Sequence, residues 1–243
     1  MTYCLALKLD EGLVCLSDTR TNAGVDNVSK YRKMFTWQAP GDRVIVMMTA
    51  GNLAITQAVM SLLQENIDNA ESGIETLFTA PSMFRVAEIV GDAMRIIQGR
   101  YGPGLAQMGE SSASSIIVAG QRVGGVPRLF HIYSAGNFIE ATEDTPYFQI
   151  GEHKYGKPIL DRVIERTTPL SRAVTAALLS MDSTLRSNLS VGMPLDLAVI
   201  RSDTIDFEQK RRIEPDDPNF VALSEGWSNA LRNAFNDLAE LEV

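Results

Sequence analysis

The chain has 243 residues, 45% of them hydrophobic and 21% charged, which is enough to form one large globular domain or two small ones. Its net charge of −8 argues against binding to nucleic acid or to an anionic membrane, because both require a basic surface. The start lacks a signal-peptide pattern, and no run approaches 18 apolar residues, so we expect a cytoplasmic protein that does not associate with membranes.

The first half of the chain predicts strands followed by helices. Two strand-like runs joined by "DEG" indicate a hairpin, and each carries one cysteine. Because Cys4 and Cys15 lie in apolar runs, we expect buried, reduced thiols rather than a disulfide or a metal site. The glycine-rich "RYGPG" predicts a turn. The expected strands are 2–9, 13–20 and 43–51, and the expected helices are 52–67 and 83–97.

The second half repeats this order and ends in a helix. Three strand-like runs punctuated by glycines cover 111–121, 126–136 and 137–141, and a later pair covers 194–203 and 205–213. Helical segments are expected at 155–165 and 172–185, the second after the capping sequence "TTPLS". The order of elements is strands, two helices, strands, two helices, strands and a helix. This order predicts one α+β domain over 1–243, with antiparallel sheets between helical layers.

The last expected helix, about 219–241, has an apolar stripe along one face. This stripe could pack on the helix's own domain or contact a partner, and the pattern does not decide between the two. The stripe consists of Phe220, Leu223, Trp227, Leu231, Phe235 and Leu238.

Two conventional types of site receive little support. The stretch "GEHKYGKP" at 151–158 nearly matches a phosphate-binding loop, but Pro158 replaces the hydroxyl residue that would hold Mg²⁺, so we expect a turn before a helix. His131 lies within a strand and His153 in a turn, and they do not have the spacing of zinc ligands. We therefore expect neither a metal nor a cofactor, and no Ser–His–Asp enzyme.

The first hairpin brings a hydroxyl, a carboxylate and a cation together. If its turn has three residues, Thr2 faces Arg20 and shares one face of the hairpin with Asp18. A two-residue turn shifts the partners by one, which keeps Asp18 close to Thr2 but removes the shared face. In either register the first residue after Met1 lies beside a carboxylate.

A threonine in such a place has a specific chemical use. Its hydroxyl becomes a nucleophile when a base removes the proton, and an N-terminal α-amine with a pKa of roughly 8 can be that base. A nearby lysine lowers the pKa of both groups, and an aspartate holds the lysine in place. The small side chain of Thr2 also makes Met1 a candidate for removal after synthesis.

At these residues the chain resembles a known family. The segment "TYCLALKLDEGLVCLSDTRTNAG", then "YRKMF", then "TAGN" at a helix start, is similar to the proteasome β-type subunits with an N-terminal threonine. More narrowly, "MTYC", "SDTRTNAGVD" and the late "SNLSVGMPLDL" resemble Anbu, a bacterial family of proteasome-related peptidases. The resemblance extends over essentially the whole chain and implies an αββα sandwich of the N-terminal nucleophile hydrolase type.

The resemblance also implies roles for single residues. Thr2 corresponds to the nucleophile, Lys33 to the catalytic lysine and Asp18 to the carboxylate that orients it. Gly51 corresponds to the glycine whose N–H stabilises the oxyanion. Two further positions match the arginine after the aspartate and the late serine near the threonine amine, namely Arg20 and Ser190.

Other positions depart from the family pattern or carry less information. Glu152 stands where β subunits have a serine, and its charge would raise the pKa of the α-amine. Ser187 stands where they have an aspartate. By the same alignment a specificity pocket, neither strongly charged nor deeply apolar, draws on Thr21, Tyr31, Phe35, Thr49, Leu53 and Gln57.

We therefore expect a threonine-type peptidase that assembles with itself into a ring or an open helical ring and acts on peptides or proteins. A small-substrate amidase or acyl transferase that uses the same Thr2 is the alternative, because Glu152 and Ser187 alter the surroundings of the amine. An inactive assembly subunit is a third possibility. The sequence does not identify an ATPase partner.

Overall fold

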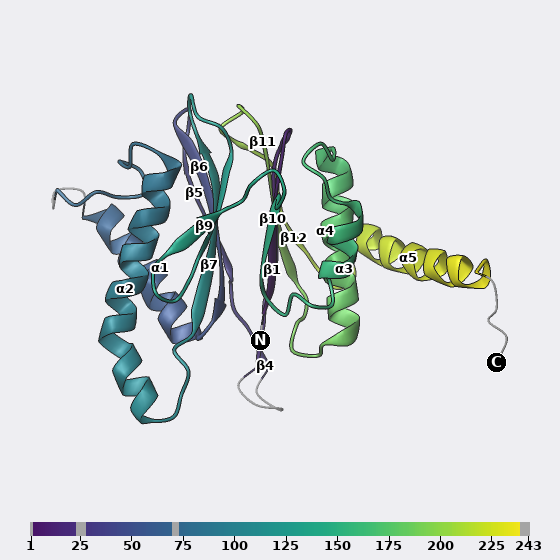
Figure 1. Ribbon diagram of the computed structural model, residues 1–243, viewed down its shortest axis with the longest axis horizontal. Coiled ribbons are helices and arrows are strands. Elements are labelled where there is room, and N and C mark those ends of the chain that lie inside the picture. The colour runs from purple at the N-terminus through teal and green to yellow at the C-terminus, as the bar shows by residue number, and fades with distance from the viewer. Residues whose placement is uncertain (1, 23–27, 70–72, 239–243) are drawn as a thin grey trace.

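Two five-stranded antiparallel sheets lie face to face and form the centre of the protein (Figure 1). The computed structural model describes residues 2–22, 28–69 and 73–238. Helices cover both outer faces of the sheet pair. The predicted α+β, four-layer αββα sandwich is confirmed.

The first sheet contains the hairpin that begins the chain. Its order is β10-β1-β2-β11-β12, with bounds β1 (Tyr3–Leu9), β2 (Gly12–Asp18), β10 (Tyr147–Gly151), β11 (Leu195–Arg201) and β12 (Phe207–Ile213). In the hairpin Leu9 pairs with Gly12 and Tyr3 comes opposite Asp18, so the turn has two residues. The expectation that Thr2 faces Arg20 and shares a face with Asp18 is therefore wrong, because the turn is one residue shorter. The two-residue alternative holds.

The second sheet has the order β5-β6-β7-β8-β9. Its strands are β5 (Met34–Ala39), β6 (Arg43–Gly51), β7 (Ser114–Arg122), β8 (Arg128–Ile132) and β9 (Phe138–Glu140). Two short strands, β3 (Arg20–Asn22) and β4 (Val28–Lys30), pair separately as a small ribbon.

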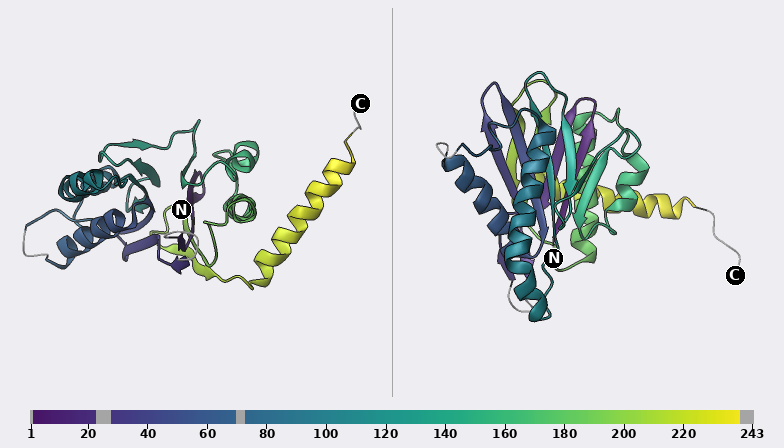
Figure 2. Two further views of the ribbon diagram at one scale, coloured as in Figure 1. Left: turned by 90° about the horizontal axis from the view of Figure 1, so that it is seen from below. Right: turned by 60° about the vertical axis from the view of Figure 1, so that its left-hand side comes forward.

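Two helices lie on each outer face of the sandwich (Figure 1, Figure 2). α1 (Leu53–Asp68) and α2 (Met83–Gln107) cover the second sheet, and α3 (Lys157–Val163) and α4 (Leu170–Ser187) cover the first. The side chain of Asn52 accepts a hydrogen bond from Ile55 N and thereby caps α1.

The turn expected at 100–104 is wrong, because α2 continues through Pro103. A proline within a helix removes one hydrogen bond and crowds the carbonyl four residues earlier. That carbonyl belongs to Gly99, which is exposed, so water can bind its oxygen.

Three apolar layers explain the stacking. One lies between the first sheet and α3 and α4, a second between the two sheets, and a third between the second sheet and α1 and α2. Residues alternate along β6, so Val46 and Met48 enter the middle layer while Ile45 and Met47 enter the outer one. A strand buried on both faces reads as a continuous apolar run, as "RVIVMMTAG" does.

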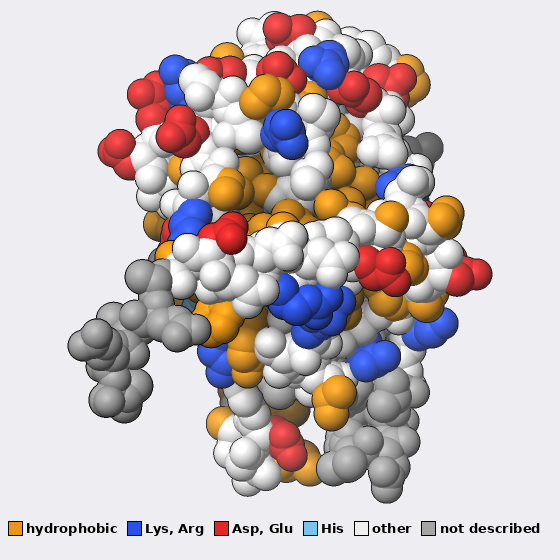
Figure 3. Space-filling view, turned by 90° about the vertical axis from the view of Figure 1, so that its right-hand side faces the viewer, with side chains coloured by type: hydrophobic (Ala, Val, Ile, Leu, Met, Phe, Trp, Pro, Cys, Tyr) orange, Lys and Arg blue, Asp and Glu red, His pale blue; other side chains and the backbone are white. Residues whose placement is uncertain are grey.

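The last helix, α5 (Pro218–Asn236), projects away from the body (Figure 1, Figure 2). It ends before the predicted residue 241, and residues 239–241 lie outside the described part of the chain. Near its start Phe220 is buried in the core below α4, whereas Leu231 and Phe235 are 51% and 75% exposed. Figure 3 looks onto this side of the molecule, where hydrophobic side chains lie among acidic and basic ones.

Candidate active site

Three strand ends meet at one end of the sandwich. β1 begins after Thr2, β2 ends at Asp18, and β6 ends at Gly51. The thiol of Cys4 lies 3.8 Å from the carbonyl oxygen of Thr49, which places the start of β1 against the end of β6. Thr2 is 7% exposed, so its side chain lies at the margin of the core.

Asp18 is the centre of the site. Its Oδ1 accepts hydrogen bonds from the backbone N–H of Tyr3 at 3.0 Å and from Nζ of Lys33 at 2.7 Å. Its Oδ2 accepts from the backbone N–H groups of Arg20 and Gly192, both at 3.2 Å. Each oxygen of this carboxylate therefore accepts two hydrogen bonds from groups of the protein itself.

The Asp18–Lys33 ion pair is shielded from water, since the two side chains are 0% and 3% exposed. Burial raises the pKa of the Asp18 carboxyl, while the charge of Lys33 and the backbone N–H donors act in the opposite direction. Nζ of Lys33 also donates to the carbonyl oxygen of Arg20 at 2.5 Å. The lysine is thus held at two points beside the residue that follows Thr2.

The backbone of Thr2 is held from the opposite side by the turn after β10. Glu152 N donates to the carbonyl oxygen of Thr2 at 2.7 Å. Gly151 has φ +82°, and a Cβ on it would lie 1.9 Å from that same oxygen, so only glycine fits. Glu152 thus lies next to Thr2, whereas Met1, whose removal we expect, lies outside the described residues.

Gly51 lies exposed at the end of β6, and the capping residue Asn52 separates it from α1. Its φ is +100°, and a Cβ there would lie 2.2 Å from the carbonyl oxygen of Ala113. Glycine is therefore required by the backbone at this position, whatever its N–H binds.

The loop that follows α4 is fastened to the same cluster. Nη1 of Arg20 donates to the carbonyl oxygen of Leu189 at 2.9 Å, so the neighbouring Ser190 is brought to this end of the molecule. The side chain of Asn188 accepts a hydrogen bond from Ser190 N. Ser187 lies exposed at the last position of α4.

The residues expected to form a specificity pocket lie around β3, β5, β6 and the start of α1. Thr49 is buried, and its N–H donates to the carbonyl oxygen of Lys33 at 3.0 Å. Tyr31 is exposed, and its N–H donates to the carbonyl oxygen of Thr19. The remaining four are Thr21 on β3, Phe35 on β5, and Leu53 and Gln57 on the first two turns of α1.

Sequence reasoning missed Tyr3 and Gly192. Besides its N–H bond to Asp18, Tyr3 is fully buried and its hydroxyl bonds Ser180 Oγ at 2.6 Å and Gln149 Nε2. Gly192 leaves room for Arg20, since a Cβ on it would lie 2.2 Å from Nε. A tyrosine inside an apolar strand needs a partner for its hydroxyl, and this was the available signal for Tyr3.

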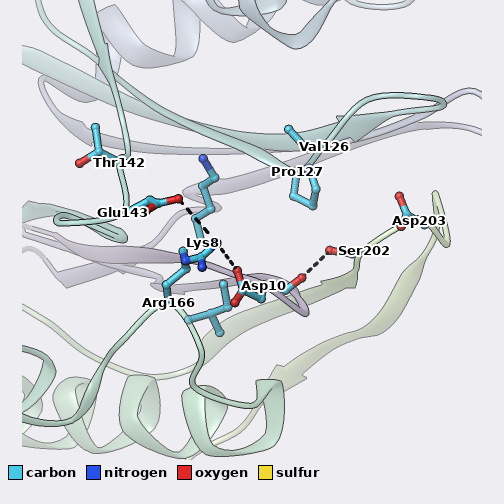
Figure 4. Close-up of a pocket in the computed structure, with 10 residues that line it drawn as sticks. Lys8, Asp10, Val126, Pro127, Thr142, Glu143, Arg166, Ser202 and Asp203 are labelled. Atoms are coloured by element: carbon cyan, nitrogen blue, oxygen red, sulfur yellow. Dashed lines mark hydrogen bonds and ion pairs between the residues drawn. The ribbon is translucent and has the colours of Figure 1, made fainter.

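A separate cavity of about 430 Å³ lies at the other end of β1 (Figure 4). Lys8 and Asp10 line it, about 20 Å along the strand from Thr2 at 3.3 Å per residue. Arg166 pairs there with Asp10 at 2.9 Å and with Glu143 at 3.7 Å, so the charges largely satisfy one another. This cavity is therefore distinct from the cluster around Asp18.

The conventional sites remain without support. The strand before "GEHKYGKP" is antiparallel to β1, which differs from the parallel-sheet setting of a phosphate-binding loop. Cys4 and Cys15 are buried free thiols. Within the described ranges, no three His, Cys, Asp or Glu side chains are placed to hold a metal ion. Nor does any helix there have the length and hydropathy to cross a membrane.

Comparison with known proteins agrees with this fold. The family model "Proteasome subunit" matches residues 2–200, while no curated protein matches the chain. A Gly-1 mutant of Anbu from Hyphomicrobium sp. strain MC1 is 52% identical, covers 100% of both chains and has a TM-score of 0.93.

Two further solved structures are similar over almost their whole length. Anbu, an ancestral beta-subunit, from Yersinia bercovieri is 47% identical over 99% of both chains with a TM-score of 0.93. The Anbu complex of Pseudomonas aeruginosa, a helical assembly, is 45% identical over 99% of this chain and 98% of that one, also with a TM-score of 0.93. The chain therefore belongs to the proteasome subunit family and is similar throughout to its Anbu members.

Proposed function

We propose that the protein is a threonine-type amide hydrolase whose nucleophile is Thr2, acting as a peptidase. The observation that carries this proposal is the buried Asp18–Lys33 pair, hydrogen-bonded to the N–H of the residue that follows Thr2. A buried ion pair costs desolvation energy and adds little stability, so its place beside the N–H of Tyr3, the residue after Thr2, argues for a chemical role.

In the proposed reaction, Met1 is first removed and the α-amine of Thr2 becomes free. The neutral amine takes the proton from the Thr2 hydroxyl, while the positive charge of Lys33 lowers the pKa of that hydroxyl, and Oγ attacks the amide carbonyl. The Gly51 N–H stabilises the oxyanion, and Arg20 and Ser190 support the amine side of the site. The amine then protonates the leaving nitrogen, and water releases the acyl group from Oγ.

A small-substrate amidase or acyl transferase is the second candidate. The Glu152 N–H binds the carbonyl oxygen of Thr2, so this acidic residue adjoins the nucleophile where the related β subunits have serine. A carboxylate there favours a positively charged amine and could select a different substrate. An inactive assembly subunit is disfavoured because such a subunit has no need for Asp18, Lys33 and Gly51 around Thr2.

We also infer that the protein assembles with itself, as the Anbu complex of Pseudomonas aeruginosa does in its helical assembly. The outer half of α5 projects with Leu231 and Phe235 exposed, and Leu238, two residues past its end, is exposed as well, which makes this half of the stripe a contact surface for a second copy. The inner half packs on its own domain through Phe220 and Leu223.

The test compares the wild type with Thr2→Ala and Thr2→Ser. Each protein is incubated with a mixture of peptides and, separately, with γ-glutamyl and other acyl amides, and the products are identified by mass spectrometry. A peptidase yields peptide fragments with the wild type, fewer with Thr2→Ser and none with Thr2→Ala. Turnover of the small amides alone supports the second candidate, and equal activity of Thr2→Ala rules out both.

A further inference from the structure

A groove of about 250 Å³ lies along the open edges of the two sheets, and one of its lining residues, Arg32, directly precedes Lys33. We name it the cationic groove. Arg32 and Thr36 line it from the β5 side, and Lys210 and Arg212 line it from β12. β5 and β12 are the edge strands of their sheets and lie on the same side of the sandwich, because Lys210 Nζ donates to Thr36 Oγ1 at 3.2 Å.

The strand register shows which side chains point into this groove. Lys210 pairs with Ala198 and Arg212 with Asp196 across β11 and β12. Ala198 belongs to the apolar layer between the sheets, and directly paired residues share a face. Lys210 and Arg212 therefore point towards the second sheet, whose edge strand β5 begins two residues after Arg32.

Positive charge exceeds negative charge here, although the whole chain carries −8. Arg212 is already paired with Asp196 through two bonds of 2.8 and 3.0 Å, and Arg211 with Asp217 at 3.2 Å. In the described part of the chain, neither Arg32 nor Lys210 has a carboxylate partner within ion-pair distance. Two cations are thus available to an anionic ligand.

The groove opens within a few residues of the buried ion pair. Arg32 directly precedes Lys33, and Asp196 directly follows Leu195, the residue that pairs with Asp18. One residue of extended chain spans about 3.3 Å, so the backbone of Arg32 at the groove margin lies about that far from the backbone of Lys33. A peptide approaching Thr2 across this end of the sandwich would pass the groove.

We propose that the cationic groove binds carboxylate side chains of an acidic peptide, so that substrates of Thr2 carry Asp or Glu near the bond that is cleaved. This inference rests on the proposed function. A volume of about 250 Å³ accommodates one or two side chains, and the acidic remainder of the surface repels a long polyanion such as nucleic acid. An acidic peptide segment fits both conditions.

The first experiment measures binding by the full-length wild type with fluorescein-labelled octa-glutamate and octa-glutamine, using fluorescence anisotropy at 50 mM salt. We expect octa-glutamate to bind at least tenfold more tightly, and 300 mM salt to remove most of the difference, because exposed charges are screened. Equal affinity for the two peptides, or no binding of octa-glutamate, overturns the proposal.

Matched variants locate the interaction. Lys210→Glu should weaken octa-glutamate binding at least tenfold and leave octa-glutamine unchanged, and Arg32→Glu provides a second variant outside the strands. Arg172→Glu on the exposed face of α4 changes the net charge by the same two units and should alter binding less than twofold. A comparable loss in Arg172→Glu would show that the effect is one of net charge and would overturn the proposal.

The last experiment separates this proposal from the proposed function. A threonine-directed β-lactone is added with and without octa-glutamate, and adduct formation on Thr2 is followed by mass spectrometry. Octa-glutamate should slow the adduct in the wild type but not in Lys210→Glu. If the adduct forms and octa-glutamate gives no protection, the groove proposal fails while the nucleophile stands. If no adduct forms in any protein, the proposed function fails, and the anisotropy measurements alone decide the groove.

Discussion

Replacing Asp18 with asparagine tests whether the carboxylate organises the site. In the structure Oδ1 accepts from Tyr3 N and Lys33 Nζ, and Oδ2 accepts from Arg20 N and Gly192 N. An asparagine side chain has one acceptor oxygen and one NH₂ group. Whichever way it is turned, the NH₂ group faces two of the four donors.

The cost of this substitution can be estimated from those contacts. Each buried donor left without an acceptor costs about 1–3 kcal/mol, and removing one member of a buried ion pair costs about 3–5 kcal/mol. We therefore expect Asp18→Asn to lower the free energy of unfolding by about 3–5 kcal/mol, mainly because the buried charge of Lys33 loses its opposite charge.

The assay is urea unfolding at one fixed protomer concentration, followed by circular dichroism. The double variant Asp18→Asn/Lys33→Met also removes the buried positive charge and should recover part of the loss. Asp196→Asn is the matched control, because its pair with Arg212 lies near the surface and should cost less than about 1 kcal/mol. A loss below about 1 kcal/mol for Asp18→Asn would refute the reasoning, since a buried carboxylate with four donors cannot be replaced so cheaply.

Three further predictions concern other parts of the molecule. Gly151→Ala should lower stability by about 1–3 kcal/mol more than Gly41→Ala in urea unfolding, because both glycines have positive φ but only at 151 does a Cβ strike the carbonyl oxygen of the candidate nucleophile; equal losses would contradict this. Burial lowers the pKa of His131, so the unfolded state binds a proton that the folded state does not, and stability falls as pH drops below about 6.5. His131→Phe should show a smaller loss of urea midpoint between pH 7.5 and 5.0 than the wild type, and parallel curves would refute the assignment. Phe235→Glu should reduce self-association in analytical ultracentrifugation, whereas Asn233→Glu, off the apolar stripe, should not; unchanged assembly in Phe235→Glu would exclude this half of α5 as the contact.

The order of the strands and helices could be predicted from the sequence, because buried strands and buried helix faces repeat apolar residues with different periods. The continuous apolar runs of β6 and β7 predicted strands, and the helical spacing of apolar residues in α1 and α4 predicted helices. The order of these elements then predicted the layers of the sandwich. β5 and β10 were not predicted. Both are edge strands of five or six residues with mixed burial, and such strands carry a weak pattern.

Details that depend on tertiary contacts could not be obtained in this way. The hairpin register depended on whether the turn had two or three residues, and "DEG" is compatible with both. α2 continues through Pro103 in a part of the helix where Gly99 and Pro103 are exposed, and local sequence does not report this exposure.

In the candidate site, too, local contacts could be predicted from the sequence and contacts between distant residues could not. The proximity of Thr2 and Asp18 followed from the hairpin. The hydrogen bonds that Lys33 and Gly192 donate to Asp18 did not follow from it, because they join residues 15 and 174 positions apart in the sequence. The assignment of Lys33 needed the resemblance to a family, and Gly192 was missed. Tyr3, whose N–H and hydroxyl both anchor the start of the chain, was overlooked because its neighbours make it read as an ordinary core residue.

The most direct test of the central claim is the chemical reactivity of Thr2. The purified protein is treated with a threonine-directed β-lactone, and its intact mass and tryptic peptides are measured beside those of Thr2→Ala and Lys33→Ala. The account predicts one adduct, on a Thr2 that has lost Met1, and none in either variant. A wild type that retains Met1 and forms no adduct, or an adduct of equal yield in Thr2→Ala, would contradict it.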